Sequence, residues 1–394
     1  MTAKDVNRIL PILLILSFIL LNSAHALRTE TAKEAGLEEQ LQLTLADSTN
    51  PVNATAHVIA SHLAGALGLP AVSPAPQPAT GAEEFVNDQG EKIIAAITIP
   101  MRTRSHPVAF VFHGLSGNKG QGHIKKLGEV LTQAGYIVIR PDFRNNRPAG
   151  KDRSQPDVNQ SDGELPAFSL ESQLDDVAMI VKQLPSRIPN ADLSRVVLAG
   201  HSYGGWTARR IAALSFQGDP RFSSLGVKAV VDLSGVINPH GSLQLYVMNS
   251  QKISLEQAKR VLERWKKDDK FAPFNNQRYW LRDGKINWET YKALDDLKAI
   301  PPTVPYVYVV GDRDDGILNR GVEAEYGSAQ YGNLAAVQPV ADFFKAVEQR
   351  GIPPLIWPNL LHEYAGPTVP ANAPTNVLDK TIGHIIEHLA AVGG

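Results

Sequence analysis

The sequence predicts an α/β fold in which helices cover both faces of a mostly parallel central sheet. Six apolar runs lack the alternation of half-buried strands, which is typical of parallel strands buried on both faces. Helical stretches with one apolar face separate these runs, as expected of repeated strand–helix–strand units. The six runs are Val108–Phe112, Tyr136–Ile139, Val196–Ala199, Ala229–Val231, Tyr306–Val310 and Leu355–Trp357.

Further elements are expected at one edge of this sheet and on its faces. Glu84–Val86, a turn at Asn87–Gly90 and Ile93–Ile99 form a predicted β-hairpin that leads into the sheet. Two helical stretches carry apolar residues on one face. These residues are Leu170, Leu174, Val177, Ala178, Val181 and Leu184 in the first stretch, and Ala341, Phe344 and Val347 in the second.

Composition excludes several classes of protein. The 394 residues are 43% hydrophobic, which is ample for a packed core. Lys and Arg total 39 and Asp and Glu total 40, so the formal net charge is −1. A protein with so small a net charge has no strong electrostatic field to attract nucleic acid or an anionic membrane surface. The absence of cysteine excludes disulfides, cysteine-ligated metals and a thiol nucleophile. The sequence contains no glycine-rich nucleotide fingerprint and no metal-ligand cluster, so we expect no cofactor and no metal.

Residues 1–26 have the pattern of a secretory signal peptide. Lys4 and Arg8 supply the basic start, Ile9–Leu21 the apolar stretch, and Ala24–Ala26 the cleavage pattern of small residues. The apolar stretch is shorter than the roughly 20 residues of a membrane-spanning helix. We therefore expect a cleaved signal, secretion or export to the periplasm, and a soluble mature protein without a stable membrane anchor.

The rest of the chain divides by composition into an arm and one domain. Residues 27–82 include the Pro/Ala-rich segment Pro70–Gly81 and are too few to hold a core of their own. We expect them to form an N-terminal arm and connector. Residues 83–394 then form the α/β domain, which contains a long insertion at 236–305.

The insertion at 236–305 is expected to form a helical cap over the sheet. Ser254 and Gln257 have the spacing of a capping box at the start of a helix whose apolar face includes Trp265. The aromatic side chains of the insertion indicate either a pocket for an apolar or aromatic group, or the core that a cap of this size needs. The residues predicted to contact substrate are His113, His240, Tyr246 and Trp280.

The strongest chemical signal is the segment Gly200–Gly205, GHSYGG. It follows the predicted strand Arg195–Ala199 and precedes a predicted helix at Trp206–Ala213. This is the context of a nucleophile elbow, a sharp turn from strand to helix that presents a serine at the carboxyl edge of the sheet. Small residues flank the serine because neighbouring backbone passes close to the turn. Ser202 is therefore the predicted nucleophile.

A serine nucleophile needs a base that an acid orients, and elbow enzymes carry the acid and then the histidine downstream of the serine. The predicted strand Tyr306–Val310 is followed by an acidic run in which Asp314 is favoured as the acid. Asp312 and Asp315 are its alternatives. His362 follows the last predicted strand and is the predicted base.

Other acids and histidines are weaker candidates for the triad. Asp232 follows the strand before the one that leads to Asp314. His384 and His388 lie one turn apart on a terminal helix and are most simply surface or packing residues. His113 and His201 belong to the loop and elbow motifs, where they shape the backbone.

The oxyanion hole of such a site uses two backbone N–H groups, one from the residue after the nucleophile and one from an early loop between a strand and a helix. Tyr203 supplies the first. The segment His113–Asn118, HGLSGN, follows the strand Val108–Phe112, so the Leu115 N–H is the expected second donor. Gly114 lets the backbone approach the developing oxyanion.

The motifs and their order resemble the α/β-hydrolase superfamily over residues 83–394, and within it the branch of cinnamoyl and feruloyl esterases and serine aminopeptidase-like hydrolases. The resemblance implies an oxyanion donor at Leu115 and a cap at 236–305, after the sixth strand of the family sheet. The sequence departs from the family pattern where the family has a glycine-containing turn: it has Asp142–Asn146 instead, followed by a polar insertion that runs to about Ala167. The segments that carry the resemblance are HGLSGNKG (His113–Gly120), GYIVIRPDFRNN (Gly135–Asn146) and GHSYGG (Gly200–Gly205).

These observations predict an exported serine hydrolase that cleaves carboxylic esters through an acyl-enzyme on a triad of Ser202, His362 and Asp314. An exopeptidase or amidase with the same mechanism is the alternative. A non-catalytic binding protein on a hydrolase scaffold is a third hypothesis, because a fold alone does not determine function. The expected partner is a small-molecule ester or amide.

Overall fold

The computed structural model describes the chain from residue 79 onward, with gaps. The described residues are 79–100, 105–148, 150–155, 158–238, 241, 244, 247–248, 251, 253–267, 291–311, 314, 340–351 and 354–357. The chain divides into two units, residues 1–77 and 78–394, and every described residue belongs to the second unit. The predicted signal peptide and most of the predicted arm lie outside the described residues.

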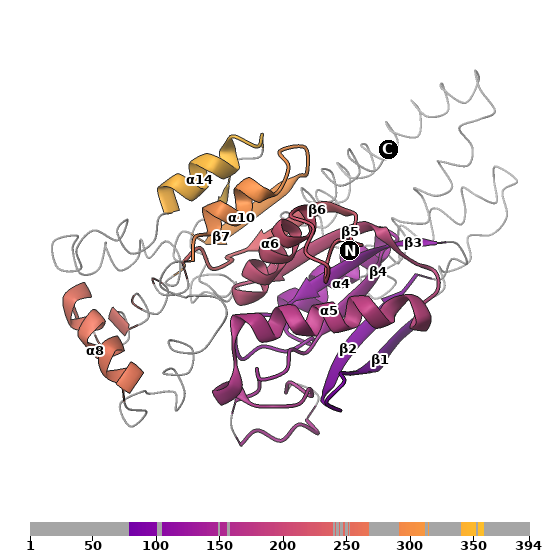
Figure 1. Ribbon diagram of the computed structural model, residues 1–394, viewed down its shortest axis with the longest axis horizontal. Helices are drawn as coiled ribbons and strands as arrows, with labels where there is room; N and C mark the ends of the chain where they lie inside the picture. The colour runs from indigo at the N-terminus through magenta and orange to yellow at the C-terminus, as the bar shows by residue number, and fades with distance from the viewer. Residues whose placement is uncertain are drawn as a thin grey trace, which may run out of the picture. The chain divides into compact units, whose positions relative to one another are not determined.

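Within the described residues, eight strands form one sheet in the order β1-β2-β4-β3-β5-β6-β7-β8 (Figure 1). β1 pairs antiparallel with β2, and β2 with β4, whereas all later pairs are parallel. The predicted mostly parallel sheet is therefore confirmed. The strands are β1 Ala79–Val86, β2 Lys92–Ile99, β3 His106–Phe112, β4 Ile137–Pro141, β5 Ala191–His201, β6 Val227–Leu233, β7 Tyr306–Gly311 and β8 Leu355–Trp357.

Helices cover both faces of the sheet, which explains why its inner strands are apolar throughout. In β3, Phe110 and Phe112 belong to the core on one face, whereas Ala109 and Val111 belong to the core on the other. Alternate side chains of a strand point to opposite faces, so a strand covered on both sides needs apolar residues at every position.

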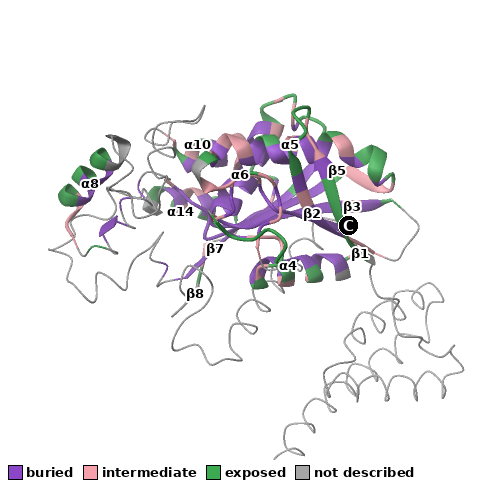
Figure 2. Cartoon of the chain, turned by 90° about the horizontal axis from the view of Figure 1, so that it is seen from below, coloured by how far each residue is buried: buried purple, intermediate pink, exposed green. Residues whose placement is uncertain are grey.

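The two helical layers are unequal (Figure 2). The core on one face includes residues of α5, α6, α10 and α14, and the core on the other includes residues of α4. None of the helices in the described part of the chain is both long and apolar enough to cross a membrane. The helix bounds are α4 Gly122–Gln133, a 3-10 turn at Leu165–Ala167, α5 Leu170–Arg187, α6 Tyr203–Phe216, α8 Leu255–Lys267, α10 Ala293–Ala299 and α14 Val340–Glu348.

The predicted amphipathic helix at residues 170–184 is confirmed as α5. Ser169 and Ser172 form a reciprocal capping box at its start, with each hydroxyl accepting the other residue's backbone N–H. Of the predicted apolar face, Ala178 is only partly buried. The fully covered positions of that face are Leu170, Leu174, Val177, Val181 and Leu184.

Two strands extend beyond their predicted limits. β1 begins at Ala79, so the last residues of the predicted connector belong to the sheet, where Ala79 pairs with Ile99. β5 begins at Ala191 rather than near Arg195. Both extensions consist of residues with weak strand preference, and pairing with a neighbouring strand decides their conformation.

The predicted cap helix is present as α8, and the last part of the insertion joins a helical layer. At the start of α8 the Ser254 N–H donates to the Gln257 side-chain oxygen at 2.9 Å, and the Gln257 N–H donates to the Ser254 hydroxyl at 3.4 Å. α10 packs on α6, where the Tyr291 ring meets the Trp206 ring edge-on at 5.8 Å. The cap itself stays a prediction.

Candidate active site

Ser202 lies at the turn between β5 and α6, as its sequence context predicts. Its backbone has φ 56° and ψ −120°, a conformation that costs a residue with a Cβ about 1–3 kcal/mol. The Ser202 N–H donates to the Leu233 carbonyl at 2.9 Å. The Ser202 carbonyl accepts from the Trp206 N–H at 3.1 Å and from the Val236 N–H at 3.3 Å. These bonds hold a strained turn at the predicted nucleophile, whose side chain is 7% exposed.

The start of α6 packs directly against the backbone that follows β3. A Cβ added at Gly204 would overlap the carbonyl oxygens of Phe112 and His113. Glycine is therefore required at this position by the close approach of two backbone segments. This contact brings the β3–α4 loop, residues 113–121, next to the turn that holds Ser202.

The β3–α4 loop touches Ser202 through Gly114. A Cβ added at Gly114 would lie 2.9 Å from the Ser202 Cβ. Leu115, the next residue, is half-buried, and its N–H donates no hydrogen bond to any residue that the structure describes. Tyr203 is the first residue of α6. The two predicted oxyanion donors are therefore on two segments that meet at the predicted nucleophile.

His113 supports this loop from inside the protein. Its ring is buried, with Nδ1 at 2.7 Å from the Gly114 carbonyl oxygen and Nε2 at 3.2 Å from the Phe143 backbone nitrogen. A carbonyl only accepts and an N–H only donates, so the ring is neutral and carries its proton on Nδ1. Burial lowers the pKa of His113, which agrees with this neutral state. The placement favours a role in holding the loop over the predicted contact with substrate.

Asn146 also contacts this loop, and sequence analysis did not single it out. Its buried side chain donates from Nδ2 to the Gly114 carbonyl at 3.1 Å and accepts the Ser116 N–H on Oδ1 at 2.7 Å. Ser116 has φ 59°, in the left-handed region that favours glycine. The sequence signal for Asn146 was its position in the segment that departs from the family pattern.

Asp142, at the end of β4, fixes the far side of the same loop. Its Oδ1 accepts the Lys119 N–H at 2.6 Å. Its Oδ2 accepts from the Lys119 ammonium at 2.7 Å and from the Gln160 N–H at 2.8 Å. Asp142 is fully buried, so all these bonds form away from solvent. The polar segment after β4 is thus tied to the β3–α4 loop.

Asp314 follows β7 at the same edge of the sheet as Ser202. It is fully buried, and its N–H donates to the Gly311 carbonyl at 3.2 Å. β6 lies between β5 and β7, and all three strands are parallel, so their carboxyl ends share one edge. The alternatives Asp312 and Asp315, and the predicted base His362, lie outside the described residues.

Asp232 has a structural partner. Its Oδ2 lies 2.6 Å from Nη1 of Arg209 and accepts the Tyr306 hydroxyl, and neither member of the ion pair is exposed. Burial raises the pKa of Asp232 even though Arg209 acts in the opposite direction. Because the Asp232 carboxylate is engaged by Arg209 and Tyr306, it is a weaker candidate than Asp314 for the acid of the triad.

The remaining predicted substrate contacts, His240, Tyr246 and Trp280, lie outside the described residues. His201, in the elbow, is buried with its ring edge-on to His123 at 4.3 Å. In the part of the chain that the structure describes, no three His, Asp or Glu side chains are grouped so as to hold a metal ion.

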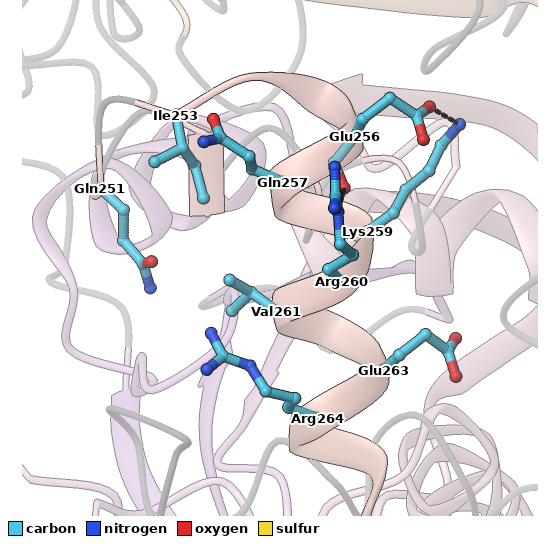
Figure 3. Close-up of a pocket in the computed structure, with 9 residues that line it drawn as sticks. All are labelled: Gln251, Ile253, Glu256, Gln257, Lys259, Arg260, Val261, Glu263 and Arg264. Atoms are coloured by element: carbon cyan, nitrogen blue, oxygen red, sulfur yellow. Dashed lines mark hydrogen bonds and ion pairs between the residues drawn. The ribbon is translucent and has the colours of Figure 1, made fainter.

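A hollow of about 740 Å³ lies along α8 (Figure 3). Charged and amide side chains line most of it, including the ion pair of Lys259 with Glu256 at 2.7 Å. Ile253 and Val261 are the apolar residues among those drawn. Among the described residues of the predicted site, none lines this hollow.

The chain matches the alpha/beta hydrolase family over residues 109–355, more than half of its length, and it therefore belongs to that family. At this broad level, the protein is therefore classed as a hydrolase.

Several solved structures are similar to the chain. Est1E from Butyrivibrio proteoclasticus is 17% identical, with 79% of this chain and 99% of that chain covered and a TM-score of 0.44. The Pyrococcus furiosus esterase Pf2001 is 14% identical, with 80% and 94% covered and a TM-score of 0.49. The Pyrococcus horikoshii acylaminoacyl peptidase is 13% identical, with 78% and 40% covered and a TM-score of 0.43. No curated protein matches the chain.

Proposed function

We propose that the chain is a serine hydrolase that cleaves carboxylic esters, with Ser202 as its nucleophile. The observation that carries this proposal is the strained backbone of Ser202, with the Gly114 backbone packed against it. Glycine would occupy such a turn with little strain, so a serine there favours a chemical role over a purely structural one. The burial of Asp314 after β7 supports the acid of the triad.

In the proposed reaction the Ser202 hydroxyl oxygen attacks the ester carbonyl carbon, and its proton passes to His362. The carbonyl electron pair becomes an oxyanion, which the Leu115 and Tyr203 N–H groups bind. When the oxyanion collapses, the bond to the alcohol breaks and His362 returns the proton to the leaving alcohol. His362 then takes a proton from water, whose oxygen attacks the carbonyl carbon of the acyl-enzyme. When this second oxyanion collapses, the bond to the Ser202 oxygen breaks, His362 returns the proton to that oxygen, and the carboxylic acid is released. Asp314 orients the imidazole and stabilises its cation.

A fluorophosphonate probe and a panel of p-nitrophenyl esters test this proposal. We expect a covalent adduct on Ser202, and a loss of at least about 10⁴-fold in kcat for Ser202→Ala. Ser234→Ala is the matched control, because Ser234 is also buried at a positive φ, 48°, after the neighbouring strand β6. This variant should keep both the adduct and the turnover.

The other outcomes select different functions. Higher kcat/KM on aminoacyl arylamides than on esters would make the chain an exopeptidase or amidase with the same nucleophile. Absence of any adduct on folded wild-type protein, together with unchanged turnover in Ser202→Ala, would contradict the serine mechanism and favour a binding protein.

We propose in addition that residues 1–26 direct export and are removed. The support is the order of basic, apolar and small residues in this segment. N-terminal sequencing of protein recovered from the periplasm or medium should start at Leu27. Recovery of the protein only from the cytosol with residues 1–26 intact would contradict this.

A further inference from the structure

We propose that Asn146 is a positioning residue that sets the direction of the Leu115 N–H. The inference deepens the proposed function and rests on it, since that N–H is the proposed oxyanion donor. Asn146 reaches the β3–α4 loop from the segment after β4, 32 residues along the chain from Gly114. It therefore acts on the loop from a different element.

The geometry of one peptide group connects Asn146 to the Leu115 N–H. The Gly114 carbonyl and the Leu115 N–H belong to the same peptide unit, which is trans because the described chain contains no cis bond. In a planar trans peptide, the C=O and the N–H point in opposite directions. Whatever holds the Gly114 carbonyl therefore also aims the Leu115 N–H.

The Gly114 carbonyl is held firmly. It accepts three hydrogen bonds, which are from His113 Nδ1 at 2.7 Å, Asn146 Nδ2 at 3.1 Å and the Gly117 N–H at 3.1 Å. His113 and Gly117 belong to the loop itself, whereas Asn146 comes from outside it. The Asn146 bond therefore ties the peptide directly to the segment that follows β4. Bonds to the carbonyl also polarise the amide and strengthen its N–H as a donor.

Asn146 holds the backbone on both sides of Leu115. While Nδ2 binds the Gly114 carbonyl, Oδ1 accepts the Ser116 N–H at 2.7 Å. The Gly114 carbonyl only accepts and the Ser116 N–H only donates. These two partners therefore determine the orientation of the Asn146 side-chain amide, with its nitrogen toward Gly114 and its oxygen toward Ser116. Ser116 is in a strained left-handed conformation, and this bond stabilises it. The side chain thus clamps the backbone before and after the proposed donor.

The backbone that Asn146 holds lies next to the proposed nucleophile. A Cβ on Gly114 would lie 2.9 Å from the Ser202 Cβ, so the clamped peptide is packed against Ser202 itself. A small rotation of the peptide would move the donor away from the oxyanion while leaving the ground-state ester free to bind. We therefore expect a change in kcat rather than in KM.

The test compares Asn146→Ala with Asn159→Ala as a matched control. Asn159 is buried in the same polar segment and also bridges backbone groups, with Nδ2 at 2.8 Å from the Phe143 carbonyl oxygen and Oδ1 at 3.0 Å from the Ser161 nitrogen. Asn159 forms no hydrogen bond with the Gly114–Ser116 backbone. Both substitutions remove two buried hydrogen bonds, so their effects on Tm should be similar.

With p-nitrophenyl acetate, Asn146→Ala should lower kcat at least about tenfold and change KM less than about threefold, because losing an oxyanion donor entirely costs about 10²–10³-fold in kcat. Binding of a trifluoromethyl ketone, whose tetrahedral adduct carries the oxyanion, should weaken in parallel with kcat/KM. Asn159→Ala should keep kcat within about twofold. If Asn146→Ala does not fold, Asn146→Ser is compared with Asn159→Ser in the same assays.

A kcat for the Asn146 variant within about twofold of wild type, or a loss no greater than that of the Asn159 variant, would overturn this inference alone. Absence of turnover that depends on Ser202 in the wild-type protein would instead overturn the proposed function, and this inference with it.

Discussion

Arg209 and Asp232 form an ion pair in which neither side chain is exposed, with 2.6 Å between Nη1 and Oδ2. Arg209 belongs to α6, the helix that begins directly after Ser202, and Asp232 is near the end of β6. The Tyr306 hydroxyl donates to the same carboxylate oxygen, and Arg209 Nη2 donates to the Val236 carbonyl at 2.5 Å. The pair ties the helix behind the predicted nucleophile to the next two strands of the sheet.

Removing one partner of this pair should destabilise the fold. Asp232→Asn leaves the Arg209 charge buried without a counter-charge, so the free energy of unfolding should fall by about 3–5 kcal/mol, measured by urea denaturation. Replacing both residues, Arg209→Met with Asp232→Leu, should recover most of the loss because no charge is then left buried. Normal stability of Asp232→Asn together with lost esterase turnover would make Asp232, rather than Asp314, the acid of the triad.

The acid of the triad is tested directly at Asp314. Asp314→Asn should lower kcat on p-nitrophenyl acetate by about 10⁴-fold, since an amide no longer maintains the correct tautomer of the histidine. Asp312→Asn and Asp315→Asn are the controls from the same acidic run and should stay within a few-fold of wild type. A large loss in one of the controls with Asp314→Asn unaffected would move the acid to that residue.

The close approach of α6 to β3 predicts opposite results for two glycine substitutions. Gly204→Ala places a Cβ on the carbonyl oxygens of Phe112 and His113, and should destabilise the protein by about 1–3 kcal/mol or more. Gly122→Ala places a Cβ in open space at the first residue of α4, and should raise stability by up to about 1 kcal/mol. Thermal unfolding measures both, and equal shifts for the two variants would contradict the packing at Gly204.

The stability of the folded protein should depend on pH because of Asp176, which lies on α5. Its carboxylate lies 2.5 Å from the Arg144 guanidinium, yet burial raises its pKa from 3.8 to about 7. The folded state therefore holds this proton more tightly than the unfolded state, so the contribution of Asp176 to stability declines as pH rises from about 4 to about 7.

The variant Asp176→Asn does not titrate and should lack this decline. The Tm of the wild-type protein relative to Asp176→Asn should therefore be highest at pH 4 and fall steadily to pH 7. Asp175→Asn, at the neighbouring position of the same helix, controls for a change of formal charge. A Tm difference between wild type and Asp176→Asn that is the same at both pH values would contradict the raised pKa.

The inner strands and the elbow could be predicted because local sequence determines them. A strand buried on both faces must be apolar at every position, so runs such as Val108–Phe112 are visible without any partner. The turn at Ser202 depends on Gly200–Gly205 and on the strand and helix at either side, all contiguous in the chain. The predicted limits of β1 and β5 are less accurate, because pairing with neighbouring strands extends both strands beyond their apolar residues.

The support of the site could not be predicted in the same way. Asn146, Asp142 and Arg209 are polar residues, and their types are compatible with an exposed turn or helix surface as well as with burial. Nothing in their spacing indicates that Asn146 faces Gly114 or that Arg209 faces Asp232. Those pairings exist because β3 and β4, and β5 and β6, are neighbours in the sheet.

The fold class, the family resemblance and the predicted nucleophile can all be inferred from the amino-acid sequence, since each depends on residues close together in the chain. The residues that hold the β3–α4 loop against Ser202, and the acid that is engaged in a buried ion pair, become visible only in the folded chain. The physical reason is that a hydrogen bond acts over about 3 Å. Arg209 and Asp232 are 23 positions apart, and Asn146 and Gly114 are 32 positions apart, so each pair meets at that distance only after the sheet has brought the strands together.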